Sequence, residues 1–150
     1  MTTEKLIIWE PLEDNPFCRY DNEMYFVDVH YQKDFVLIFE DIKNFKEYRF
    51  TYKQDKAQTY AIISFRIFDE LGRPDIDDLI GNAWRENEGT LTYKPTFYKV
   101  ENSSWISWYD SIYPARVGLY PNAEHHLYVT SDFMLEVISE NEPVITVEKQ

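Results

Sequence analysis

The sequence predicts a mainly β fold, either one antiparallel sheet or a sandwich of two sheets, with two short helices. An α+β arrangement is the alternative. Short runs of aromatic and β-branched residues recur along the chain, aromatic residues make up 17% of it, and polar turns separate the runs. The length of 150 residues fits a single domain over 1–150, because a chain of this size can bury a sizeable core.

The clearest strand signal lies at residues 24–31, where large aromatic and branched side chains alternate with others. The alternation would place Tyr25, Val27, Val29 and Tyr31 on one face. Such a pattern is typical of a strand with one face on the core and the other toward solvent.

A hairpin should follow, because 32–34 is polar and 35–39 is a continuous apolar run, typical of a strand buried on both faces. The segment 60–68 also fits a helix, but its isoleucines favour a strand. Short turns between strands indicate antiparallel pairing. The other expected strands are 6–9, 48–52, 91–93, 97–100, 126–130 and 133–139, with a last strand or tail at 144–147.

The first predicted helix covers 75–84, where apolar residues recur every three or four positions. Asp75, Asp77 and Asp78 lie in its first turn, where the helix dipole favours negative charge. The third ligand step of a calcium loop is missing, because Leu79 and Ile80 begin an apolar face where the loop should continue, so no calcium site is expected.

The second predicted helix should begin after a capping serine, Ser103 or Ser104, and end before Pro114. Four large apolar side chains would share one face of it: Trp105, Trp108, Tyr109 and Ile112. A helix this short has no room to bury all its large rings, Tyr113 included, on one side.

Some of these rings should therefore be exposed, and exposed aromatic residues among charges are typical of protein-binding surfaces. We predict a binding surface at Trp105, Trp108, Tyr109 and Asp110. The alternative is that the rings cover one open end of the sheet as part of the core.

The chain carries 27 acidic and 15 basic residues, a formal net charge of −12. It therefore repels the phosphates of nucleic acids and anionic lipids, so we expect neither nucleic-acid nor membrane binding. No apolar run approaches the about 20 residues of a membrane helix. A basic protein partner fits this charge, and a cation or a neutral ligand remains open.

Cysteine usage and the first residues indicate the compartment. Cys18 is the single cysteine, so the chain has no internal disulfide, which is typical of a reducing environment. The first residues lack the basic and apolar stretches of a secretory signal. We expect a cytoplasmic protein.

The sequence contains no catalytic motif, no nucleotide-binding loop and no complete metal site, and it predicts no cofactor. His125 and His126 are adjacent and would point to opposite faces of a strand, so one metal ion cannot readily bind both. An alternative function is a small hydrolase or ligand-binding β-protein whose pocket holds Asp28, His30 and His126. A structural or assembly role is a further alternative, and the oligomeric state is left open.

Four stretches in the last third of the chain carry a resemblance to other proteins: Ser104–Tyr109, His125–Thr130, Leu135–Ser139 and Glu142-Pro143. They resemble the end of a loose group of small, uncharacterised bacterial proteins, some of them similar to immunity proteins that neutralise secreted toxins. The resemblance implies a bacterial, non-enzymatic inhibitor that binds another protein, and it implies no catalytic residue. An acidic inhibitor suits a basic toxin, because complementary charges speed association.

Overall fold

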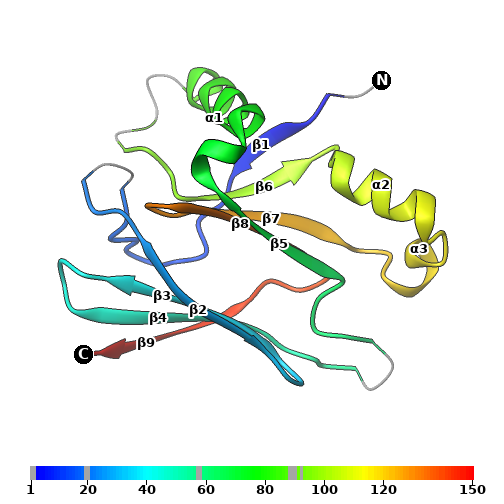
Figure 1. Ribbon diagram of the computed structural model, residues 1–150, viewed down its shortest axis with the longest axis horizontal. Coiled ribbons are helices and arrows are strands. Elements are labelled where there is room, and N and C mark those ends of the chain that lie inside the picture. Colours follow the sequence, from blue (N-terminus) through cyan, green and yellow to red (C-terminus); the bar gives the residue numbers. More distant parts are fainter. Residues whose placement is uncertain (1–2, 19–20, 57–58, 88–90, 92) are drawn as a thin grey trace.

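The computed structural model, which describes residues 3–18, 21–56, 59–87, 91 and 93–150, contains two antiparallel sheets (Figure 1). One sheet has the order β1-β6-β7-β8-β5 and the other β2-β3-β4-β9, so the predicted mainly β fold is confirmed. The strands of the described residues are β1 (Lys5–Ile8), β2 (Tyr25–Tyr31), β3 (Phe35–Asp41), β4 (Lys46–Tyr52), β5 (Ser64–Asp69), β6 (Phe97–Glu101), β7 (Glu124–Val129), β8 (Phe133–Ser139) and β9 (Val144–Lys149).

The predicted hairpin is confirmed as β2 and β3, which pair from Tyr31 opposite Phe35 to Tyr25 opposite Glu40. The predicted common face of β2 is wrong, because the register shifts between Phe26 and Asp28. This bulge adds one residue to the strand and reverses the alternation at that point. As a result Phe26 joins the core beside Val29, while Tyr25 is exposed.

Two further strand predictions differ from the structure. The segment 60–68 forms a strand only from Ser64 onward. Leu91 and Tyr93 lie outside any strand, and Thr92 lies outside the described residues, so a strand at 91–93 is not observed. The predicted strand 133–139 is confirmed with the same bounds as β8.

The main core lies between the two sheets and is built largely from aromatic rings. Phe50 of β4 packs against Phe39 of β3 and against Phe97 and Tyr128 of the opposite sheet, with ring centroids 5.3 to 5.5 Å apart. These four rings are fully buried. Aromatic pairs at such separations add to the stabilisation that burial of their surface already gives.

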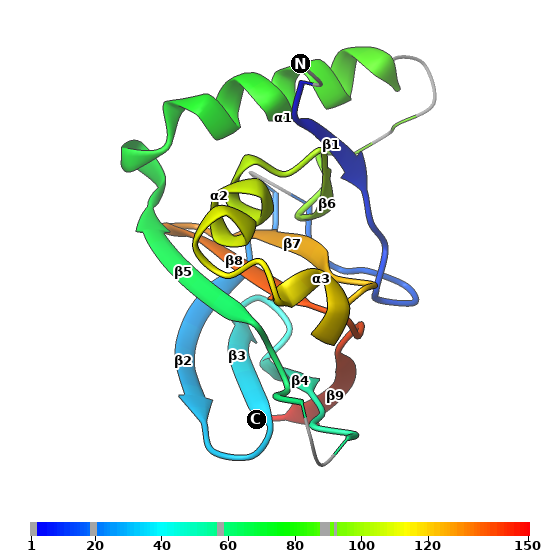
Figure 2. The same cartoon turned by 90° about the vertical axis from the view of Figure 1, so that its right-hand side faces the viewer.

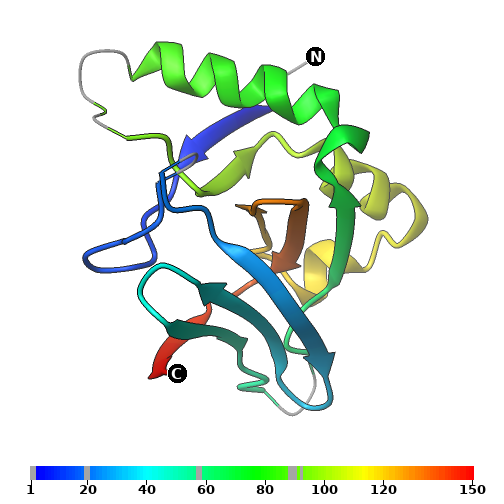
Figure 3. The same ribbon diagram turned by 60° about the vertical axis from the view of Figure 1, so that its left-hand side comes forward.

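Helices cover the other face of the five-stranded sheet, so α1 and the four-stranded sheet lie on opposite sides of it (Figure 3). The described helices are the 3₁₀ turn η1 (Glu70–Gly72), α1 (Pro74–Glu86), α2 (Ser104–Ile112) and α3 (Arg116–Leu119). Ile76 and Ala83 of α1 pack on Leu6, Leu127 and other sheet residues in a second apolar cluster. The single turn α3 was not predicted, because four residues are too short to show a periodic pattern.

Candidate functional site

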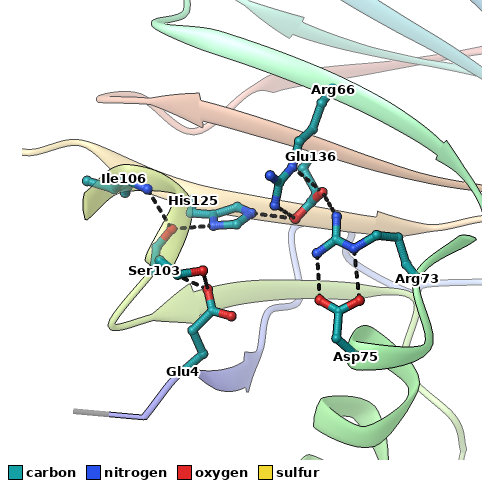
Figure 4. Close-up of polar contacts among 9 residues, drawn as sticks. Glu4, Arg66, Arg73, Asp75, Ser103, Ile106, His125 and Glu136 are labelled. Carbon is teal, nitrogen blue, oxygen red and sulfur yellow. Dashed lines mark hydrogen bonds and ion pairs between the residues drawn. The ribbon is translucent and has the colours of Figure 1, made fainter. Parts of the chain in front are cut away.

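The second helix, α2, starts at a well-defined cap. Asn102 has a φ of 57°, which turns the chain sharply at the end of β6. Of the two predicted cap candidates, Ser103 is the cap residue, and its Oγ accepts a hydrogen bond of 3.1 Å from the backbone N–H of Ile106. Glu4 reinforces this end, because its Oε2 accepts from both the backbone N–H and the hydroxyl of Ser104 (Figure 4).

The cap is tied to the sheet by a chain of hydrogen bonds (Figure 4). Ser103 Oγ lies 2.7 Å from Nδ1 of His125 on β7, and Nε2 of His125 lies 2.8 Å from Oε1 of Glu136 on β8. All three side chains are buried. This chain fixes the start of α2 relative to the two central strands of the sheet.

Glu136 is a carboxylate placed inside the protein, with only 1% of the residue exposed. Arg66 on the neighbouring strand β5 donates to both of its oxygens at 2.6 and 3.0 Å, and Arg73 donates at 2.7 Å. Arg73 also pairs with Asp75 in the first turn of α1. Two guanidinium groups and an imidazole therefore satisfy a charge that would otherwise be costly to bury.

The order serine, histidine and carboxylate resembles that of a hydrolase triad, but the contacts differ. In a triad the serine meets Nε2 of the histidine and the carboxylate meets Nδ1. Here the nitrogens are exchanged, Ser103 Oγ also caps α2, and Glu136 binds two arginines. Each group thus has a structural partner, and the arrangement anchors α2.

We name the side chains that tie α2 to the sheet the anchoring network: Ser103, His125, Glu136, Arg66 and Arg73. This network should make the stability of the fold depend on pH. Burial alone would raise the pKa of Glu136, but its hydrogen bonds with His125 and Arg66 outweigh that effect and lower the pKa to about 2. Because the pKa is lowered, ionised Glu136 stabilises the fold at pH values above the ordinary pKa of a glutamate. This contribution is lost as the pH falls from about 4.5 toward 2.

We expect about 3 kcal/mol of unfolding free energy to be lost through Glu136 between pH 4.5 and pH 2. Urea unfolding at a series of pH values measures the loss. In Glu136→Gln the curve of stability against pH should be shallower over this interval. Parallel curves for the two proteins would contradict the assignment.

The predicted apolar face of α2 is wrong in one respect, because its rings do not share one environment. Trp105 is buried at 6% exposure, edge-on to His125 and beneath the guanidinium of Arg66, which lies 4.1 Å from the ring centroid. Trp108 and Ile112 are exposed. Trp105 is the one buried residue of α2, and it lies in the first turn of the helix. Trp105 is thus a core residue.

Asp110 has a defined partner within the protein. Arg116 of α3 donates to both oxygens of Asp110 at 2.6 and 2.5 Å and to the carbonyl of Tyr120 at 3.0 Å. These hydrogen bonds from Arg116 lower the pKa of Asp110. The ion pair connects α2 to α3 and keeps the two helices in one orientation.

Helices α2 and α3 lie on one side of the molecule, toward the viewer in Figure 2, and we name their exposed large apolar side chains the α2–α3 face. Its large side chains are Trp108, Ile112, Tyr113, Val117 and Leu119, exposed by 57, 61, 36, 56 and 49%. Tyr109 is half-buried and links Trp108 to Tyr113, with ring centroids 6.5 and 5.9 Å apart. Clustered apolar exposure of this kind marks interaction sites.

The structure does not bring Asp28, His30 and His126 together. Asp28 and His30 are exposed on the outer side of the four-stranded sheet, and Asp28 accepts from the backbone N–H of Val29. His126 is fully buried between the sheets, where Nδ1 lies 2.8 Å from the Tyr52 hydroxyl and the ring stacks on Trp9. Burial lowers the pKa of His126.

The sequence reasoning missed the anchoring network, although one signal was available. Glu136 stands alone as a charge in the otherwise apolar strand Phe133–Ser139. A carboxylate at an inward position must find partners, because an unpaired buried charge is very costly. Its partners come from β5, β7 and the segment before α1, and no spacing in the sequence identifies them.

Comparison of the chain with known proteins found no similar protein: no family model, no curated protein and no solved structure matches it. Among the residues that the structure describes, no group of three or more histidine, cysteine, aspartate or glutamate side chains is placed to hold a metal ion. In the same part of the chain, no helix is both long enough and apolar enough to cross a bilayer.

Proposed function

We propose that this chain is a non-enzymatic protein-binding domain, an inhibitor of the bacterial immunity type that binds a basic protein partner in the cytoplasm. The observation that carries the proposal is the α2–α3 face. It exposes one tryptophan and four other large apolar side chains on two short helices and the turn between them, and the Asp110–Arg116 pair joins the two helices. Tryptophan and tyrosine are the residues most often found as anchors in protein interfaces.

Charge supports the choice of a basic partner. The net charge of −12 attracts a cationic protein over distances longer than a contact and repels nucleic acid and anionic lipid. The anchoring network supports the same proposal, because it holds the α2–α3 face in one position before any partner arrives. A preformed surface loses little conformational entropy on binding.

The proposal is tested by photo-cross-linking in the native host. A photoreactive phenylalanine analogue replaces Trp108 in one protein and Phe45 in a control, since Phe45 is equally exposed but lies in the β3–β4 turn. We expect capture of one defined basic protein from position 108 and not from position 45. Equal capture from both positions, or capture of acidic proteins only, would contradict the proposal.

Trp108→Ala should weaken binding of the captured partner by about 30-fold or more, because truncating a central aromatic anchor typically costs 2 kcal/mol or more. Isothermal titration calorimetry measures the change. Phe45→Ala provides the matched control and should leave affinity within about twofold. Unchanged affinity in Trp108→Ala would remove the α2–α3 face from the interface.

A further inference from the structure

A groove lies beside α2. It encloses about 770 Å³ and is bounded by α2, the strands β1 and β6, and the start of β7. Four apolar residues from these segments line it: Ile7, Val100, Ile106 and Ala123. Ile7 lies on the edge strand β1 and is 41% exposed. The groove therefore offers apolar surface that no part of the described chain covers.

The polar lining of the groove is acidic. It holds three glutamates, Glu4, Glu101 and Glu124, against a single cation, Lys99. Lys99 is already neutralised, because its Nζ lies 3.1 Å from Glu124 and 2.7 Å from Glu142. Glu101 is exposed and forms no ion pair with any residue that the structure describes.

The groove adjoins a second hollow whose lining includes Trp108. Ser104 lines the groove and also the hollow formed by Arg66, Trp105 and Trp108 on the adjacent side of α2. A partner seated on Trp108 can thus reach across α2 into the groove.

We infer that the groove receives a lysine- or arginine-bearing amphipathic segment of the protein partner. Apolar side chains of that segment contact Ile7 and Ile106, and its cations meet Glu4 and Glu101 at the rim. This inference rests on the proposed function and names the chemistry of the partner. An acidic or purely apolar segment would leave the rim carboxylates facing like charge or no charge.

The test uses the full chain with methyl-labelled isoleucine and, as the probe, a synthetic amphipathic peptide of lysine, leucine and alanine. We expect the peptide to shift the NMR signals of Ile7 and Ile106 but not of Ile42, an exposed isoleucine in the β3–β4 turn. A peptide with glutamate in place of lysine should cause no shift. Affinity should fall as salt is added, because Glu101 is exposed and Glu4 is only half-buried.

The double variant Glu4→Gln/Glu101→Gln should bind the peptide about three- to tenfold more weakly, as expected for two exposed charge pairs. Glutamine at position 4 keeps an oxygen that accepts from Ser104. The matched control is Glu47→Gln/Glu148→Gln, which removes two charges from a cross-strand pair on the other sheet. It should change affinity by less than twofold.

Absence of peptide binding, shifts elsewhere than at Ile7 and Ile106, or equal losses in both double variants would overturn the groove as a cationic site. Such a failure is separable from that of the proposed function. If Trp108 still cross-links a basic protein while the groove variants bind it normally, the function stands and the groove is excluded. If both experiments fail, the proposed function and the assignment of the groove as a binding site are both contradicted.

Discussion

Glu136→Gln should lower the free energy of unfolding at pH 7 by about 3–5 kcal/mol, the range found when one partner of a buried ion pair is removed. The amide cannot neutralise Arg66 and Arg73, whose side chains are only 28 and 14% exposed. Native domains are stable by only about 5–15 kcal/mol, so the variant should be close to its unfolding threshold. Urea denaturation followed by tryptophan fluorescence measures the change.

The loss should also be local. Hydrogen exchange of the backbone amides at the start of α2 should accelerate, since Glu136 holds that end through His125 and Ser103. Glu148→Gln, an exposed change of the same chemistry, should stay within about 0.5 kcal/mol of the parent protein. A loss below about 1 kcal/mol in Glu136→Gln would show that the arginines are satisfied in another way.

Phe50→Ala should lower the free energy of unfolding by about 3–5 kcal/mol, because it removes a fully buried ring and leaves a cavity between the sheets. The rings of Phe39, Phe97 and Tyr128 would lose their common neighbour. Differential scanning calorimetry measures the effect. Leucine at position 50 retains more volume and should cost less.

The matched control for this cavity is Phe45→Ala, which deletes an identical ring that is 65% exposed. It should change stability by about 0.5 kcal/mol or less. Equal losses at the two positions would mean that the interface between the sheets is loosely packed. That result would contradict the close ring contacts around Phe50.

Local patterns predicted most of the strands and both longer helices. The strand at Phe133–Ser139 and the cap at Ser103 depend on neighbours within a few residues, and both were found as expected. The face assignment of β2 failed because a bulge between Phe26 and Asp28 leaves no mark in the composition of the strand. A periodic pattern assumes regular pairing, and pairing is a property of two strands rather than one.

The candidate site was predicted only in part, for a related reason. Some rings of α2 were expected to be exposed, but which of them is buried depends on how the helix packs on the rest of the fold. The anchoring network joins residues from β5, β7 and β8 whose proximity depends on sheet order. Strand order is set by contacts across the whole chain, so no local window of sequence contains it.

The way the chain alternates between the sheets has a consequence for folding. β9 completes the four-stranded sheet beside β4, and β1 completes the five-stranded sheet beside β6. Until residues 144–149 have been synthesised, one edge of β4 has no partner strand and can pair with other chains. Pairings this distant in sequence also make folding slow, in the range of milliseconds to seconds. The unpaired edge of β4 therefore favours aggregation of a newly made chain until β9 docks.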